Sequence, residues 1–278
     1  MLRIPEAPKS IQKGVPLKNV LGSEAIDCLA QNMSYVYPEF NVQGFIAIAT
    51  DNLEPLGIND RGLHIARALR EHLPSKYKHA IKIILASLTP PNTETEGLGL
   101  AVLFYHPHSY FIAEYGVDKK YNEGEDPFEI SMKAQYELTK RSTSEFSIRP
   151  FLNQYQERTL SQIKEWVVDP DPHVRRLCSE GARPRLPWAP RIQAFIQDPS
   201  PTLPILEALK NDEVLYVRRS VANHLGDIAK DHPELVFGIC ERWLIDATKD
   251  VKWIIRHALR HPAKKQNKMA LQIRAAAK

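Results

Sequence analysis

Two carboxylates and one tryptophan in the second half of the chain lie among basic side chains. Glu145 precedes Arg149 by four residues, and Asp227 precedes Lys230 by three. Trp188 lies in a segment that also holds arginines and prolines. Carboxylates and an aromatic face stabilise a cationic reaction centre, while arginine and lysine bind a polyanion. Together these residue types predict chemistry on DNA.

One reaction on DNA that such groups can assist is the hydrolytic loss of an alkylated base. Alkylation at a ring nitrogen can make a base a cation, which then leaves the deoxyribose as a neutral group while positive charge builds on the sugar. A carboxylate beside the sugar stabilises that charge and orients water. An aromatic face against the cation contributes roughly 0.5 to 2 kcal/mol. Neither device uses a metal or a redox cofactor, so we expect none.

A purely structural role competes with the catalytic one for each of these residues. Glu145 suits a helix N-terminus and an ion pair with Arg149. Asp227 and Lys230 suit a surface ion pair worth about a few tenths of a kcal/mol. Trp188, in a loop crowded by prolines, suits a gap between structural repeats. Spacing alone leaves these alternatives open.

The helix that carries Asp227 is predicted over residues 214–230. Apolar residues at steps of three or four form a stripe that we expect to be buried: Val214, Val217, Val221, Leu225 and Ile228. Polar residues at similar steps form a second stripe: Arg219, Asn223, Asp227 and Lys230. Asp227 is therefore expected on an exposed face.

The second half of the chain also repeats itself. Related segments, each with a valine followed by a basic residue, begin at Asp171, Asp212 and Asp246, and their valines lie 43 and 34 residues apart. That spacing brackets the two-helix unit of HEAT and armadillo arrays. Partner helices are expected at 157–168, at 191–197 with 203–210, and at 235–244. Helical periodicity runs almost throughout, so the predicted fold is all-α, a HEAT-like helical repeat solenoid with a concave basic surface.

Charge is unevenly divided along the chain. Residues 141–278 carry 23 Lys and Arg against 16 Asp and Glu, a net +7, whereas residues 1–140 carry −3. The excess predicts a nucleic-acid face in the C-terminal half. The candidate DNA-binding residues are Arg149, Arg175, Arg183, Arg185, Arg219, Asn223, Lys230, Lys252 and Arg256. An alternative for any single arginine is an ion pair with an aspartate of the neighbouring repeat.

Composition points to a soluble protein of one large domain over residues 1–278. We expect N-terminal helices in 1–125, the repeats with the active site in 126–262, and a basic tail in 263–278. No apolar run is long enough to cross a membrane and no signal peptide is visible, so we expect a cytoplasmic protein, brought to the nucleoid by DNA. The three distant cysteines are expected to be small apolar fillers rather than disulfide or zinc ligands.

Three segments resemble the AlkC branch of the AlkC/AlkD DNA alkylation-repair glycosylases, which are HEAT-like repeat proteins. They are Thr143–Phe151, His173–Trp188 and Tyr216–Lys230, within roughly residues 129–243. The resemblance implies hydrolytic release of N3-methylcytosine and N3-methyladenine from double-stranded DNA, leaving an abasic site. It further implies a sharply bent duplex and no base flipped into a pocket.

Carried onto this sequence, the resemblance makes Glu145 and Asp227 the catalytic carboxylates and Trp188 the aromatic group beside the lesion. Two features depart from the family. Gly226 stands where relatives are expected to have asparagine. Some relatives also carry an immunoglobulin-like domain that grips DNA, which we do not expect here, and the basic residues after Pro262 are a candidate substitute for it.

The main competing interpretation is a non-catalytic HEAT-like scaffold that binds nucleic acid or protein. Such a protein gains nothing from carboxylates near phosphates. Enzymes of other classes are disfavoured because the chain lacks the GxGxxG, GxxxxGK[ST] and HExxH motifs. We expect a monomer with no obligate protein partner.

Overall fold

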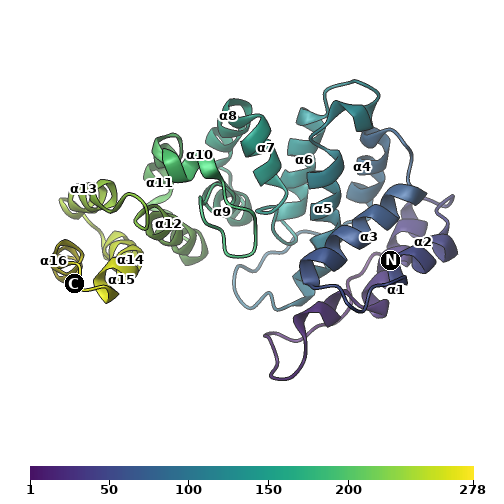
Figure 1. Cartoon of the computed structure of the whole chain (residues 1–278), viewed down its shortest axis with the longest axis horizontal. Coiled ribbons are helices and arrows are strands. Elements are labelled where there is room, and N and C mark those ends of the chain that lie inside the picture. Colours follow the sequence, from purple (N-terminus) through teal and green to yellow (C-terminus); the bar gives the residue numbers. More distant parts are fainter. The chain divides into compact units, whose positions relative to one another are not determined.

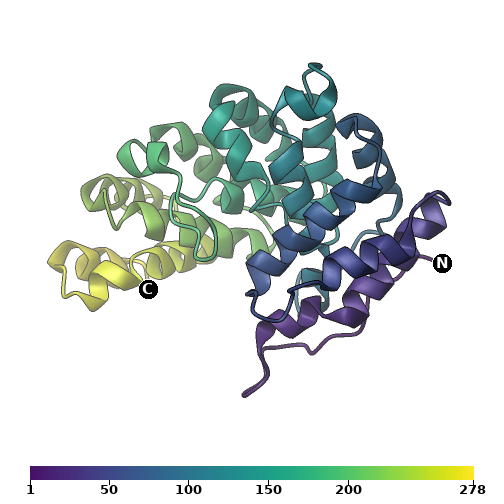
Figure 2. The ribbon, with the colours of Figure 1, turned by 45° about the vertical axis from the view of Figure 1, so that its right-hand side comes forward.

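The computed structural model describes all residues, 1–278, and every regular element in it is a helix (Figures 1 and 2). The predicted all-α class is therefore confirmed. The chain forms two compact units, residues 1–150 and 151–278. The prediction of a single solenoid domain, with its repeats beginning at residue 126, stays a prediction.

The N-terminal unit is built on six α-helices and three short 3-10 helices. The α-helices are α1 (Ser23–Val36), α2 (Val42–Thr50), α3 (Ile58–His72), α4 (Tyr77–Ala86), α5 (His106–Tyr115) and α6 (Phe128–Thr139). The 3-10 helices are η1 (Leu17–Leu21), η2 (Ala101–Tyr105) and η3 (Lys119–Asn122). Helix α3 packs against α5 and α2. Gly97 and Gly99 have positive φ in the loop before η2, a conformation that only glycine adopts readily.

Helix α7 (Ile148–Gln154) spans the boundary between the units, and the C-terminal unit continues with a series of helices. They are α8 (Gln156–Trp166), α9 (Pro172–Gly181), α10 (Gln193–Gln197), η4 (Ser200–Thr202), α11 (Leu203–Leu209), α12 (Leu215–Ile228), α13 (Pro233–Leu244), α14 (Lys249–Ala258), α15 (Arg260–Lys264) and α16 (Lys268–Ala276). The three repeated segments form α9, α12 and α14, and α12 packs against both α9 and α14 (Figure 1). The helical repeats are confirmed.

Polar caps and ion pairs fix the repeated helices in place. The carboxylate of Asp171 accepts from His173 N at 2.8 Å at the start of α9, and that of Asp212 accepts from Val214 N at 2.9 Å before α12. The same Asp212 accepts from Arg175 Nε at 2.6 Å, so Arg175 joins one repeat to the next. Arg218 pairs with Asp250 in the same way, at 2.9 Å.

Residues 263–278, expected to be a basic tail, include a folded helix. Ala270 and Ile273 of α16 are buried, and the helix packs against α13 and α14. Pro262 and Ala263 of α15 are buried as well. This segment is therefore part of the packed helical array, and its lysines lie on the outside of a structured element.

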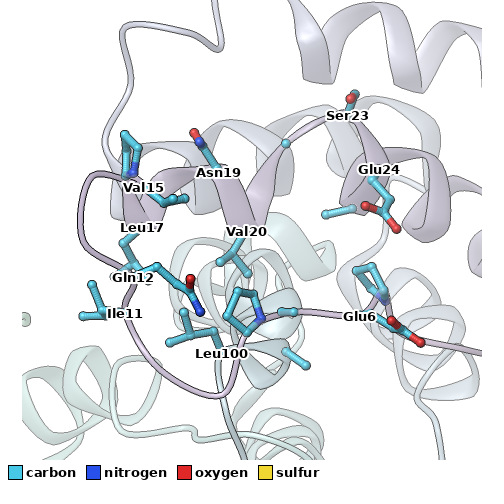
Figure 3. Close-up of a pocket in the computed structure, with 17 residues that line it drawn as sticks. Glu6, Ile11, Gln12, Val15, Leu17, Asn19, Val20, Ser23, Glu24 and Leu100 are labelled. Carbon is cyan, nitrogen blue, oxygen red and sulfur yellow. The ribbon is translucent and has the colours of Figure 1, made fainter.

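Three further features bear on the sequence predictions. All three cysteines are buried and unpaired, as expected of apolar fillers. No helix has the length and apolar character needed to span a bilayer. A hollow of about 310 Å³ lies between the N-terminal segment and η1, with Ile11, Val20 and Leu100 on its walls (Figure 3). None of the predicted site residues lines it.

Candidate active site

Asp227 is buried near the end of α12, with 3% of its surface exposed. Its Oδ2 accepts from Arg183 Nε at 2.8 Å, and its Oδ1 accepts from Lys230 Nζ at 2.8 Å. The prediction that Asp227 lies on an exposed face is wrong. The loop after α9 folds Arg183 onto the carboxylate, a contact between residues 44 positions apart. Helical spacing within α12 carries no information about it.

Arg183 holds two carboxylates at once. Its Nη1 donates to Glu180 Oε1 at 2.6 Å while its Nε donates to Asp227. Glu180 is buried and also accepts from Ser220 Oγ at 2.6 Å. The network therefore runs from the end of α9 through Arg183 to α12, and it fixes the Asp227 side chain from one side.

The network is balanced in charge. Burial by itself raises the pKa of Glu180, but the guanidinium groups of Arg176 and Arg183 outweigh it and hold that pKa below its usual value. Burial lowers the pKa of Arg183, and Glu180 and Asp227 more than reverse the effect. Arg183 thus stays cationic between two carboxylates.

Gly226 permits a close approach of α12 to α14. A Cβ atom on this residue would lie 3.2 Å from the carbonyl oxygen of Ala258. Since that oxygen belongs to the backbone, a larger residue requires the end of α14 to move. This is a physical reason for glycine at a position where relatives were expected to have asparagine.

Asn223 connects the Asp227 helix to α14. Its Oδ1 accepts from Arg260 Nη2 at 3.0 Å and lies 3.0 Å from His257 Nε2. Burial, followed by the charges of Arg260 and Arg219, lowers the pKa of His257 to about 4. The imidazole is therefore neutral near pH 7, and its Nε2–H donates to Asn223.

Trp188 lies in the loop between α9 and α10 with 53% of its surface exposed, so it does not plug a gap between repeats. Hydrogen bonds fix both ends of this loop. Ile192 N donates to Pro184 O at 3.1 Å, and Arg185 makes two hydrogen bonds of 2.7 Å to Asp231. About half of the Trp188 side chain is therefore accessible to solvent.

Glu145 belongs to the N-terminal unit, where it is half-buried just before α7. The hydroxyl of Thr143 donates to its Oε2 at 2.8 Å, and its own backbone N–H donates to that hydroxyl at 3.3 Å. This local turn orients the carboxylate.

Three of the predicted DNA-binding arginines are buried. Arg149, Arg175 and Arg183 are 2%, 9% and 7% exposed. Arg175 and Arg183 are also paired with aspartates, in agreement with the alternative that single arginines form ion pairs between repeats. We therefore do not propose these three as phosphate contacts. The accessible members of the set are Arg185, Arg219, Asn223, Lys230, Lys252 and Arg256.

Sequence reasoning missed Glu180, Ser220 and Arg260, which surround the Asp227 network. Glu180 precedes Arg183 by three residues, a spacing typical of an ion pair at a helix end, and could have been found. Ser220 and Arg260 offered no such local signal.

No group of three or more His, Cys, Asp or Glu side chains is placed to hold a metal ion.

Comparison with known proteins finds similarity both in sequence and in structure. No protein-family model matches the chain. It is 38% identical over 258 residues to the uncharacterized protein YhaZ of Bacillus subtilis (strain 168), covering 92% of this chain and 67% of YhaZ. Pseudomonas fluorescens alkylpurine DNA glycosylase AlkC, solved bound to DNA containing an abasic site analog, matches with a TM-score of 0.80 and 36% identity, over 93% of this chain and 67% of that one. The chain therefore belongs to the AlkC family of alkylpurine DNA glycosylases.

Proposed function

We propose that this protein is a monofunctional DNA glycosylase that hydrolyses the N-glycosidic bond of N3-methyladenine and N3-methylcytosine in double-stranded DNA. The products are a free base and an abasic site. Family membership supports glycosylase activity on alkylated bases, and the solved relative was captured on DNA with an abasic site analog. We further propose that the protein acts as a monomer and reads the lesion without flipping it into a pocket.

The observation that carries this proposal is the buried carboxylate of Asp227, held between Arg183 and Lys230. Removing a charge from water is costly, and a protein that only binds phosphates gains nothing from a carboxylate here. For a glycosylase the arrangement is useful because an ionised, fixed carboxylate stabilises the oxocarbenium charge on the sugar and orients the attacking water.

The two partners of Asp227 differ in how easily they can be displaced. Arg183 is buried and held on its other side by Glu180, whereas the Lys230 side chain is 41% exposed. Because the ammonium group of Lys230 remains accessible to solvent, a DNA phosphate can compete with Asp227 for it. In the proposed mechanism that exchange opens Asp227 Oδ1 toward the sugar while Arg183 keeps Oδ2 in place.

Glu145 and Trp188 complete the proposed site. Glu145 is the second carboxylate, and the hydrogen bond from Thr143 sets its orientation. The exposed ring of Trp188 lies against the cationic base, where the ring quadrupole attracts positive charge. The backbone phosphates are held along a concave basic surface by the six accessible polar residues: Arg185, Arg219, Asn223, Lys230, Lys252 and Arg256.

A base-release assay combined with a binding assay separates this function from that of a scaffold. The variants are Glu145→Gln and Asp227→Asn, on duplexes that carry either methylated base. We expect each amide to lower base release by roughly 100-fold or more while DNA affinity is kept or increased, since a negative charge is lost near phosphates. A wild-type protein that binds these duplexes and releases neither base is a scaffold.

A further inference from the structure

A small cationic hollow lies at the C-terminal end of the repeat array. It measures about 250 Å³ and is lined by Trp253, Arg256, His257, Arg260 and Arg274. The rings of Trp253 and His257 are stacked, with their centroids 4.9 Å apart and an angle of 19° between their planes, and they form a flat wall. Three guanidinium groups therefore share one small space.

These arginines differ from the arginines that connect the repeats because they bind no carboxylate. Arg260 Nη1 donates to the carbonyl oxygen of His257 at 2.7 Å, and its Nη2 donates to Asn223. Arg256 donates to the carbonyl oxygen of Ala277. Arg274 has a buried Nε with no acceptor at all. By contrast, Arg175, Arg183, Arg185 and Arg218 each pair with an aspartate.

The missing negative charge cannot come from nearby in the sequence, because residues 251–278 contain no aspartate or glutamate. The charges around Arg260 reflect this lack of negative charge. Burial and the charge of Arg183 lower the pKa of Arg260, and Asp227 only partly offsets them. Crowded like charges cost free energy, and an anion with several acceptor oxygens removes that cost.

The hollow also lies next to the Asp227 network. Asn223, which accepts from Arg260, precedes Asp227 by one helical turn on α12. Arg260 is close enough to Asp227 and Arg183 for their charges to act on it. An anion bound here therefore lies near the carboxylate that we place at the reacting sugar.

From this geometry we propose that Arg256, Arg260 and Arg274 form a dedicated pocket for one backbone phosphate of the DNA strand, beside the damaged nucleotide. The inference rests on the proposed function. Guanidinium groups suit the role because their planar donors match the oxygens of a phosphodiester. The bound phosphate fixes the register of the strand, so that the same sugar is always presented to Asp227.

Single methylphosphonate linkages test the pocket, because each removes one phosphate charge at a known position. We would measure the affinity for duplexes with an abasic site analog and one such linkage at successive positions, for wild type, Arg260→Gln and Arg274→Gln. Lys264→Gln is the matched control, since it removes one exposed charge outside the hollow. Arg274→Lys keeps the charge and loses the planar donors, and thermal unfolding checks that each variant is folded.

For wild type and Lys264→Gln we expect one linkage position to weaken binding by at least about tenfold. Arg260→Gln and Arg274→Gln weaken binding to unmodified DNA and lose sensitivity at that position alone, and Arg274→Lys shows a partial loss. Folded variants that keep the wild-type profile at every position contradict the phosphate pocket and leave the proposed function standing. A wild-type protein that binds none of the duplexes contradicts the proposed function, and the pocket with it.

Discussion

At the scale of single residues, the arginines divide into two groups by their partners. Arg175, Arg183 and Arg218 are buried and paired with aspartates, so they connect repeats. Arg219 and Arg260 are exposed and bind no carboxylate. The distinction separates arginines that build the site from those available to DNA, although both kinds follow one another in the sequence, as at Arg218 and Arg219.

Arg183→Gln tests the bridge between Glu180 and Asp227. The change leaves two buried carboxylates without their shared cation, so we expect a loss of about 3–5 kcal/mol in the free energy of unfolding. Arg185→Gln is the control, because its pair with Asp231 is partly exposed and its loss should cost about 1 kcal/mol or less. Urea unfolding measures both. Equal effects of the two changes would show that Arg183 is an ordinary surface pair.

Trp188→Ala tests the aromatic face. Because the side chain is 53% exposed, we expect little change in thermal stability. The single-turnover rate of base release should fall by roughly 2- to 30-fold, which corresponds to about 0.5–2 kcal/mol of lost cation–π attraction, while Trp188→Phe keeps part of the rate. A drop in unfolding temperature with an unchanged rate points instead to a packing role.

At the scale of elements, the sequence predicts the helices well and the site only in part. The valine spacing and the aspartates that precede the helices predicted α9, α12 and α14 because both signals are local. The burial of Asp227 could not be predicted, since it depends on Arg183 reaching over from a loop 44 residues away. The sequence predicts a tail at 263–278 because its many basic residues mask a short stripe of buried ones, Ala270, Ile273 and Ala277.

The contact between α12 and α14 can be tested at Gly226. Gly226→Ala places a methyl group 3.2 Å from the Ala258 carbonyl oxygen, and we expect overpacking of about 1–3 kcal/mol that exceeds the gain in helix propensity. Gly238→Ala on α13 is the matched control, because no atom lies within 4 Å of its added Cβ. It should stabilise the protein by roughly 0.5–1 kcal/mol. Stabilisation by both changes in chemical unfolding would contradict the close packing.

At the scale of the whole molecule, buried neutral histidines make stability depend on pH. Burial lowers the pKa of His108 to about 3, and of His106 and His224 to about 4, from about 6.5 in the unfolded chain. The unfolded chain therefore binds more protons than the folded one in acid. The stability that depends on these neutral histidines is fully present above about pH 6.5 and is lost progressively as pH falls toward 4.

We expect the unfolding temperature to fall steadily between pH 6.5 and 4, and His108→Leu to flatten that decline. His108 suits the test because it is fully buried and neither ring nitrogen has a hydrogen-bond partner. His79→Leu, the same change at an exposed histidine, should leave the slope unchanged. An unfolding temperature that is constant over this range, measured by calorimetry, rules out the neutral buried histidines.

The most direct test of the central claim is the single-turnover rate of base release from duplex DNA with one N3-methyladenine, measured for wild type and Asp227→Asn under conditions that saturate binding. We predict that wild type releases the free base and leaves an abasic site, and that the amide lowers the rate by roughly 100-fold or more without weakening binding. Equal rates for the two proteins, or saturated wild-type complexes that release no base, would contradict the role of Asp227 at the centre of this site.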